Sequence, residues 1–152
     1  MNPKLNLFWR QALSSCLLAG IAGLAMHARA ASPSRPVSPD LGGIYDCTGQ
    51  DSQEGPYTAV VTLTSQSAHS VGQHRAYDFK MEVPGYGTYL GQAVGAGAHL
   101  AIHFALTDPA TRDFGTGLAQ VFKRHGKPGF SKFYYEPEFK GGNHGTEECL
   151  RR

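Results

Sequence analysis

Apolar and polar residues alternate along most of this chain in short runs that glycine and proline interrupt. In residues 75–83, for example, Tyr77 and Phe79 alternate with Asp78 and Lys80. A two-residue period is typical of a β-strand, because successive side chains of a strand point to opposite faces. The pattern predicts strands over residues 43–48, 57–64, 75–83, 86–94, 99–106, 114–122, 130–136 and 145–150. No segment keeps the 3.6-residue period of an amphipathic helix, so little helix is expected.

About eight short consecutive strands favour an all-β fold, a single antiparallel up-and-down barrel. Closure into a barrel pairs the edge strands that an open sheet would leave exposed. A β-sandwich whose terminal strands pair with each other is the alternative. Glycine is abundant, with 19 residues in 152, and strands that curve tightly use glycine at their bends.

The first thirty residues have the pattern of a cleavable export signal. Lys4 and Arg10 precede an apolar run over residues 12–26, and Ala28 and Ala30 supply small side chains around a cleavage point. The run is shorter than the roughly 20 residues that cross a bilayer as a helix. We therefore predict a signal peptide over residues 1–30, cleavage near Ala30, a periplasmic or secreted mature protein, and no stable membrane span.

Two further segments follow the predicted signal. Residues 31–40 are rich in proline and serine and predict an extended tether, because proline removes backbone donors. Residues 41–152 then form the single β-barrel domain. Of the 14 Lys and Arg residues, three lie in the signal, which has no acidic residue, so 11 remain against 12 Asp and Glu. A mature chain so close to neutral gives no basis for a nucleic-acid partner.

Two cysteines remain once the signal is removed. Cys16 leaves with it, and lies near the start of the apolar run, whereas a lipid-bearing cysteine would follow that run. In an oxidising compartment Cys47 and Cys149 are expected to form one disulfide. They lie in the first and last predicted strands, which are neighbours only if the barrel closes. A metal-bound or redox pair is the alternative, and it lacks a Cys-x-x-Cys spacing.

Four short motifs span nearly all of the predicted domain. They are Gly43-Ile44-Tyr45-Asp46-Cys47-Thr48-Gly49, Gly55-Pro56-Tyr57, Tyr89-Leu90-Gly91-Gln92-Ala93-Val94 and Gly145-Thr146-Glu147. Together they resemble a group of small exported bacterial proteins with lipocalin-like or avidin-like barrels, mostly of undefined function. The resemblance implies a barrel fold and a periplasmic location, and it brings no catalytic residues.

A second resemblance rests on Tyr45-x-Cys47 and the cysteine in the final predicted strand. These features are similar to those of periplasmic inhibitors of c-type lysozyme, which are also small eight-stranded barrels with a disulfide. That family presents an inhibitory serine-glycine loop. The nearest loop here, Gly85-Tyr86-Gly87-Thr88-Tyr89, has no serine.

Histidines and acidic residues do not form a predicted metal site. His99 and His103 share one face of a strand but stand about 13 Å apart, too far to bind one ion. Glu147 and Glu148, near His144, point to opposite faces of their strand. No serine or cysteine nucleophile has a recognisable setting. We expect no metal, no cofactor and no enzymatic activity; a polar cluster at a barrel mouth is the feature that would indicate an enzyme.

Aromatic side chains are the remaining candidates for function. An eight-stranded barrel is either filled by its own side chains or just wide enough for one small ligand. The candidate ligand or partner contacts are Tyr77, Phe79, Tyr89, Phe104 and Tyr134. The run Phe133-Tyr134-Tyr135 places rings on both faces of a strand, so at least one ring is expected at the surface.

The sequence therefore predicts an exported, non-enzymatic β-barrel that binds a small apolar ligand or a protein partner in the cell envelope. A ligand carrier requires an internal cavity with an opening. The alternative is a periplasmic inhibitor or immunity-type protein that acts on an envelope enzyme such as lysozyme. An inhibitor of this kind requires a filled core and a protruding loop.

Overall fold

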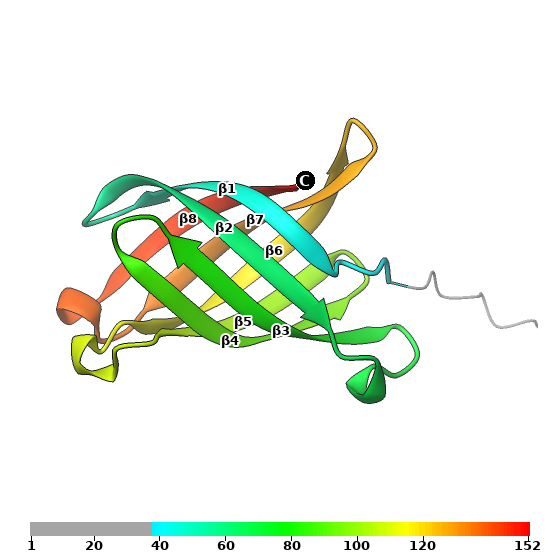
Figure 1. Ribbon diagram of the computed structural model, residues 1–152, viewed down its shortest axis with the longest axis horizontal. Helices are drawn as coiled ribbons and strands as arrows, with labels where there is room; N and C mark the ends of the chain where they lie inside the picture. The colour runs from blue at the N-terminus through cyan, green and yellow to red at the C-terminus, as the bar shows by residue number, and fades with distance from the viewer. Residues whose placement is uncertain (1–37) are drawn as a thin grey trace, which may run out of the picture. The chain divides into compact units, whose positions relative to one another are not determined.

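The computed structural model describes residues 38–152 (Figure 1). They form the strands β1 (Gly43–Asp51), β2 (Gly55–Ser65), β3 (His74–Val83), β4 (Gly87–Ala96), β5 (His99–Leu106), β6 (Phe114–Arg124), β7 (Lys127–Glu136) and β8 (Asn143–Arg151). Each strand pairs antiparallel with the next, and β8 pairs with β1. The predicted closed, eight-stranded up-and-down barrel is confirmed. The predicted signal peptide and residues 31–37 of the predicted tether lie outside the described residues.

Helical structure in residues 38–152 is confined to three short 3-10 turns. They are η1 (Ser67–His69), η2 (Pro109–Thr111) and η3 (Phe139–Gly141), each of which lies in a connection between strands. Within this part of the chain, no helix has the length and apolar character needed to cross a membrane.

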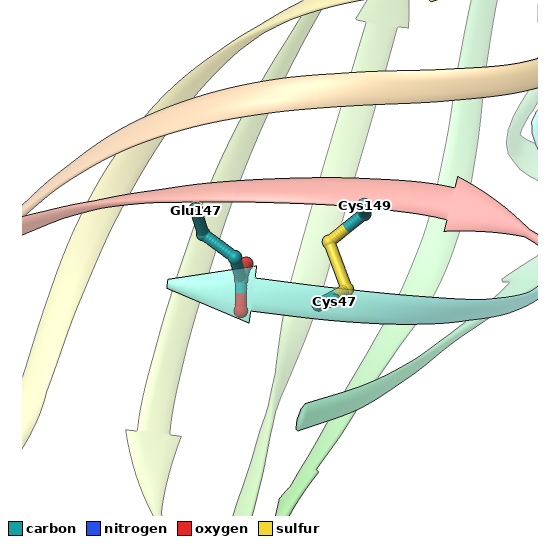
Figure 2. A group of neighbouring side chains, drawn as sticks. All are labelled: Cys47, Glu147 and Cys149. Carbon is teal, nitrogen blue, oxygen red and sulfur yellow. A yellow bond between two sulfur atoms is a disulfide. The ribbon is translucent and has the colours of Figure 1, made fainter. Parts of the chain in front are cut away.

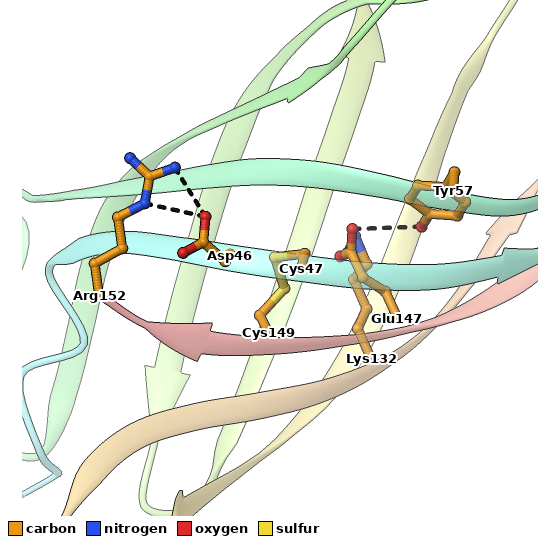
Figure 3. Close-up of a disulfide and its surroundings, with 7 residues drawn as sticks. All are labelled: Asp46, Cys47, Tyr57, Lys132, Glu147, Cys149 and Arg152. Carbon is orange, nitrogen blue, oxygen red and sulfur yellow. Dashed lines mark hydrogen bonds and ion pairs between the residues drawn. A yellow bond between two sulfur atoms is a disulfide. The ribbon is translucent and has the colours of Figure 1, made fainter.

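The disulfide joins the two strands that close the barrel. Cys47 of β1 and Cys149 of β8 are directly opposite each other in the strand register, with a Cα–Cα distance of 4.1 Å and an S–S distance of 2.03 Å. The predicted bridge is confirmed. Figure 3 shows it between the paired strands, and both half-cystines are buried.

The core is made by the inward residues of the eight strands. Because successive side chains of a strand point to opposite faces, every second side chain points into the barrel. Aromatic rings form much of the buried core there. Tyr45 packs on Phe130 with ring centroids 5.2 Å apart, and Phe104 packs on Tyr134 at 5.9 Å. The histidines of β5, His99 and His103, are exposed on the outside.

The segment before β1 closes one end of the barrel. Leu41 is buried, its amide donates to Tyr77 Oη at 3.1 Å, and its carbonyl accepts from Tyr45 Oη at 2.6 Å. Ser38 is also buried and accepts a hydrogen bond from the amide of Gly97. The other end, at the left of Figure 1, is formed by the β1–β2, β3–β4, β5–β6 and β7–β8 connections. We call this end the mouth.

Candidate functional site

A cavity of about 90 Å³ lies at the mouth. Its walls are apolar where Met81, Val83 and Phe104 face it. Because Glu54 and Tyr86 also line it and are exposed, the cavity reaches the surface. The remaining lining residues are Asp51, Tyr57, Tyr89, Asp113, Lys132, Tyr134, Glu136 and Phe139. Three of these, Asp51, Asp113 and Glu136, are buried carboxylates, and we call them the mouth carboxylates.

Asp113 is held by two tyrosines from the neighbouring hairpin. It lies between η2 and the start of β6, and its backbone carbonyl accepts from the amide of Leu106. Its Oδ2 accepts hydrogen bonds from Tyr89 Oη at 2.8 Å and Tyr86 Oη at 3.0 Å, whose rings are stacked. Burial, followed by the hydrogen bond to Asp113 and its charge, raises the pKa of Tyr86 to about 12 and raises that of Tyr89 further. Both hydroxyls therefore remain donors.

The second oxygen of Asp113 accepts no hydrogen bond from an amide, a hydroxyl or a basic side chain. The residue is 3 % exposed, and among residues 38–152 only the neighbouring carboxyl of Glu136, when it is protonated, shares a further hydrogen bond with Asp113. A buried acceptor without a hydrogen bond costs the desolvation of that group. This oxygen is the position in the mouth that most requires a donor.

Asp51 differs because all of its acceptor positions are occupied. The amides of Gln53 and Glu54 donate to Oδ1 at 2.8 and 2.9 Å, and Tyr134 Oη and Asn143 Nδ2 each donate to Oδ2 at 2.7 Å. Burial opposes ionisation, yet these hydrogen bonds outweigh it and lower the pKa of Asp51. Asp51 is a charged carboxylate that organises the β1–β2 connection.

Glu136 is the mouth carboxylate most easily protonated. It lies at the end of β7, and its Oε2 accepts from Asn143 Nδ2 at 2.6 Å. Burial, together with the negative charges of Asp113 and Asp51 and a side-chain hydrogen bond shared with Asp113, raises its pKa to about 7, although the bond from Asn143 opposes that change. Glu136 therefore changes its charge near neutral pH.

No basic side chain compensates the mouth carboxylates in the described part of the chain. None of the three has a Lys, Arg or His nitrogen within 4 Å. The two basic residues of the surrounding connections are already paired, Arg112 with Glu138 and Lys140 with Glu54. The mouth is thus a region of buried acidic groups, of which Asp51 is compensated by hydrogen bonds and Asp113 and Glu136 lack a counter-charge.

Deeper in the barrel, one lysine is compensated. Lys132 of β7 and Glu147 of β8 are directly opposite each other, and their Nζ and Oε2 atoms are 2.6 Å apart with both side chains buried (Figure 3). Tyr57 donates to Glu147 Oε1 at 3.3 Å. The ammonium also lies 5.3 to 5.5 Å from the centroids of three rings, those of Phe79, Phe104 and Tyr134.

Glu147 also lies beside the disulfide. Figure 2 shows its carboxylate next to the sulfurs of Cys47 and Cys149, and one ligand atom of each lies within 4.8 Å of the others. Metal binding by cysteine requires thiolates, and these two sulfurs are bonded to each other. Because Glu147 is also occupied by Lys132, this group is a structural cluster in the oxidised protein.

The five predicted contact residues all point into the barrel, but they divide between its two ends. Tyr89, Phe104 and Tyr134 line the mouth cavity. Phe79 lies deeper, where its ring contacts that of Phe104 at 6.5 Å, and Tyr77 lies at the closed end with Leu41. Within the run 133–135, Tyr134 is buried, while Phe133 and Tyr135 are exposed.

The mouth carboxylates and the Lys132–Glu147 pair were absent from the sequence prediction, although alternation signalled most of them. Asp51 has the same parity as Cys47 in β1, and Glu136 the same parity as Tyr134 in β7. Asp113 lies in a connection, where alternation predicts nothing.

Comparisons of the chain with family models, with curated proteins and with solved structures find no match.

Proposed function

We propose that this protein is an exported, non-enzymatic barrel that binds a small molecule in its mouth. The observation that supports this most directly is the cavity beside the mouth carboxylates, which combines apolar walls with a few polar groups. Small-molecule sites in proteins have this composition. At about 90 Å³ the cavity is smaller than the roughly 300 to 1,000 Å³ of sites for drug-sized ligands. It therefore takes a small ligand, or one group of a larger ligand whose remainder stays outside.

A polar cluster at the barrel mouth, the feature that would indicate an enzyme, is present. We nevertheless propose binding, because the chemistry available there is limited. Asp51 is occupied by four donors, and Asp113 Oδ2 by two. A general acid or base must lie within hydrogen-bond reach of the proton that it transfers, and a cavity of about 90 Å³ has room for little more than one substrate group.

The experiment is a fragment screen by two-dimensional NMR of the uniformly ¹⁵N-labelled mature protein, with two matched variants. Val83→Phe fills the cavity from its wall, and Val94→Phe makes the same change on the exposed side of β4. We expect fragments of a few carbon atoms to shift the amide signals of Glu54, Tyr86 and Asp113. These shifts disappear in Val83→Phe and persist in Val94→Phe. Fragments that bind both variants equally, or that never shift these signals, would contradict the proposal.

Export is a separate part of the proposal, supported by the pattern of residues 1–30. The test is the intact mass of the protein recovered from the periplasm and the medium of a bacterial host that expresses the full chain. We expect a mature chain that begins at Ala31. Recovery of only the full-length chain in the cytoplasm would contradict it.

Exposed apolar residues on the outer wall support a second candidate, an inhibitor of an envelope enzyme. Val94, Ala101, Leu118 and Phe133 are directly opposite one another across β4, β5, β6 and β7. Leu118 and Phe133 are 62 % and 54 % exposed, and contiguous apolar surface of this kind marks protein interaction sites. In an assay of peptidoglycan hydrolysis by a c-type lysozyme, this candidate predicts inhibition by the wild type. The double variant Leu118→Ser/Phe133→Ser loses it, and no inhibition by the wild type would remove lysozyme as the target.

A further inference from the structure

The mouth carries a charge imbalance that a ligand can correct. Of the charged side chains buried in the described barrel, four are acidic and one is basic, and that one, Lys132, is paired with Glu147. A buried charge is costly unless a counter-charge or several hydrogen bonds compensate it. Asp51 is compensated by its four donors, whereas Asp113 and Glu136 have no cation within 4 Å in residues 38–152.

One oxygen at the cavity requires a donor. Asp113 lines the cavity and is almost fully buried, and once Glu136 is ionised no group in residues 38–152 donates to its Oδ1. Tyr86 and Tyr89 hold the same carboxylate through its Oδ2, so the orientation of the free oxygen is fixed. A positively charged donor gives a shorter and stronger hydrogen bond to such an oxygen than a neutral donor does.

The barrel already contains one ammonium group in matching surroundings. Lys132 Nζ lies 2.6 Å from a Glu147 oxygen and within 5.5 Å of three ring centroids. Carboxylate and aromatic faces together attract a cation, the rings through their quadrupoles. The mouth cavity continues these surroundings, since Phe104 and Tyr134 line it together with Tyr89, the mouth carboxylates and Lys132 itself, whose charge is already paired with Glu147.

We propose that the mouth binds the ammonium group of a small aliphatic amine, which donates to Asp113 Oδ1 while its carbon chain lies against Met81, Val83 and Phe104. This inference rests on the proposed function, because it names the chemical class of the ligand for the same cavity. Glu136 supplies the second negative charge. The bound ammonium compensates both carboxylates in the way that Lys132 compensates Glu147.

A metal ion fits the site less well than an organic cation. In residues 38–152, the only three potential ligand groups whose atoms lie within 4.8 Å of one another are Cys47, Glu147 and Cys149, so the three mouth carboxylates do not converge on one point. A hard divalent cation takes six or more oxygen ligands, whereas Met81, Val83 and Phe104 present carbon and sulfur to the cavity. The apolar wall matches an alkyl chain.

The size of the cavity limits the ligand. A cavity of about 150 Å³ accommodates benzene, and this one is about 90 Å³. It therefore holds an ammonium group with a few carbon atoms, and a longer amine extends toward the surface, where Glu54 and Tyr86 are exposed.

Binding is expected to compete with protonation of Glu136. The groups that act on this carboxyl are Asp51 of β1, Tyr89 of β4, Asp113 of the β5–β6 connection, with which it shares a hydrogen bond, and Asn143 of β8, which donates to it. Lys132 of its own strand also lines the cavity, but it is paired with Glu147. Because the pKa of Glu136 is about 7, the site has one more negative charge at pH 8 than at pH 6. A ligand that requires the ionised carboxylate binds about tenfold more weakly at pH 6.

The test is isothermal titration calorimetry of the mature protein with three probes of the same chain length, in a phosphate buffer free of amines. The probes are butylammonium chloride, butan-1-ol and sodium butyrate, which are cationic, neutral and anionic. We expect butylammonium to bind at least about tenfold more tightly than the other two, which is the range of a hydrogen bond to a charged group.

We also expect Asp113→Asn to weaken butylammonium binding at least about tenfold, whereas Asp46→Asn, on the exposed face of β1, leaves it unchanged. Glu136→Gln is expected to abolish the difference between pH 6 and pH 8, because the amide does not titrate.

Other calorimetry results would overturn the assignment of an ammonium ligand or the proposed function itself. If butanol or butyrate binds as tightly as butylammonium, or if Asp113→Asn binds butylammonium as well as the wild type, the ammonium assignment is overturned while small-molecule binding stands. If calcium chloride displaces butylammonium and binds more tightly, the mouth is a metal site and the assignment is also overturned. If no probe binds at all, and the fragment screen is negative, the proposed function fails with it.

Discussion

Five charged side chains are buried in the described barrel, and each has a different environment. Asp51 is saturated with hydrogen bonds, Lys132 and Glu147 compensate each other, Asp113 is half satisfied, and Glu136 has a single donor. A charged carboxylate is therefore stabilised at Asp51 and destabilised at Glu136, although both accept a hydrogen bond from Asn143 Nδ2. Buried ionisable groups that lower the stability of the folded protein and line a cavity are typical of functional sites.

The raised pKa of Glu136 gives a pH dependence of stability with a defined sign. Its pKa is near 4.5 when unfolded and about 7 when folded, so the folded state binds the proton more tightly. The stability that this proton provides is complete below pH 4.5 and is lost as the pH rises through 7. We expect Glu136→Gln to be close to wild type at pH 4.5 and more stable by about 1 to 3 kcal/mol at pH 8.

Urea unfolding of both proteins at pH 4.5, 6 and 8 measures this difference. The pKa of Asp51 is lowered, so its contribution has the opposite sign and is lost as the pH falls. Asp51 is present in both proteins, and its contribution cancels in the comparison. A difference between Glu136→Gln and wild type that is the same at all three pH values would show that Glu136 has no raised pKa.

The buried pair Lys132–Glu147 predicts strong coupling between two substitutions. Lys132→Met leaves Glu147 as an unpaired buried charge, and we expect it to lower the free energy of unfolding by about 3 to 5 kcal/mol. Adding Glu147→Gln removes that charge, so the double variant should recover most of the loss. A double-mutant cycle measured by urea unfolding gives the coupling. Additive effects of the two single substitutions would mean that the pair does not interact in solution.

At the scale of the strands, glycine residues lie opposite the inward aromatic rings. Gly145 of β8 is directly opposite Tyr134 of β7, and a Cβ atom at Gly145 would stand 2.3 Å from Tyr134 Oη. The ring therefore lies over the backbone of the neighbouring strand, and its hydroxyl reaches Asp51. The absence of a side chain at Gly145 thus positions one donor of the mouth.

Two alanine substitutions test this arrangement. Gly145→Ala displaces the Tyr134 hydroxyl from Asp51, and we expect a loss of about 1 to 3 kcal/mol in the free energy of unfolding, as in other overpacked cores. Gly95→Ala is the control, because it is also buried in a strand and its nearest neighbour would be 3.6 Å away. That change should be neutral or stabilise by roughly 0.5 kcal/mol. Equal effects of the two substitutions would contradict the role assigned to Gly145.

Alternation predicted the strands well because it reports which face of each strand is buried. All eight predicted strands are present, and most extend further at their ends, since hairpin pairing continues into the turns. The same alternation places Lys132 with Phe130 and Tyr134, and Glu147 with Cys149, so both charges could have been assigned to the interior. Asp113 could not, because its position depends on how the β5–β6 connection folds over Tyr86 and Tyr89.

At the scale of the whole molecule, the disulfide fastens the closure of the barrel. It connects residues 102 positions apart across the β1–β8 seam. In the chain-entropy model a loop of about 100 residues gains roughly 4 to 5 kcal/mol from such a link. We expect the variant Cys47→Ala/Cys149→Ala to lose about 2 to 5 kcal/mol of unfolding free energy and to keep its β-sheet circular dichroism at low temperature. Urea unfolding of the oxidised wild type, the reduced wild type and the variant measures this loss of unfolding free energy. A loss below about 1 kcal/mol would contradict a stabilising role of the disulfide.

Closure could be predicted from the sequence because the paired cysteines lie in the first and last strands. The cavity could not, since its volume depends on how the rings of Tyr89, Phe104 and Tyr134 pack across the barrel. Tertiary packing also decides which end of the barrel has a cavity. Residues 38–41 enter one end and close it through Leu41, which leaves the mouth as the end with a cavity.

A crystal structure of the mature protein grown with butylammonium chloride at pH 8 would show whether the mouth cavity binds a small cationic ligand. We predict one butylammonium in the cavity, with its nitrogen within hydrogen-bond distance of Asp113 Oδ1 and its carbon chain against Met81 and Val83. A mouth that contains only water, or a butylammonium that lies on the outer wall beside Leu118 and Phe133, would show that the mouth is not a cation site.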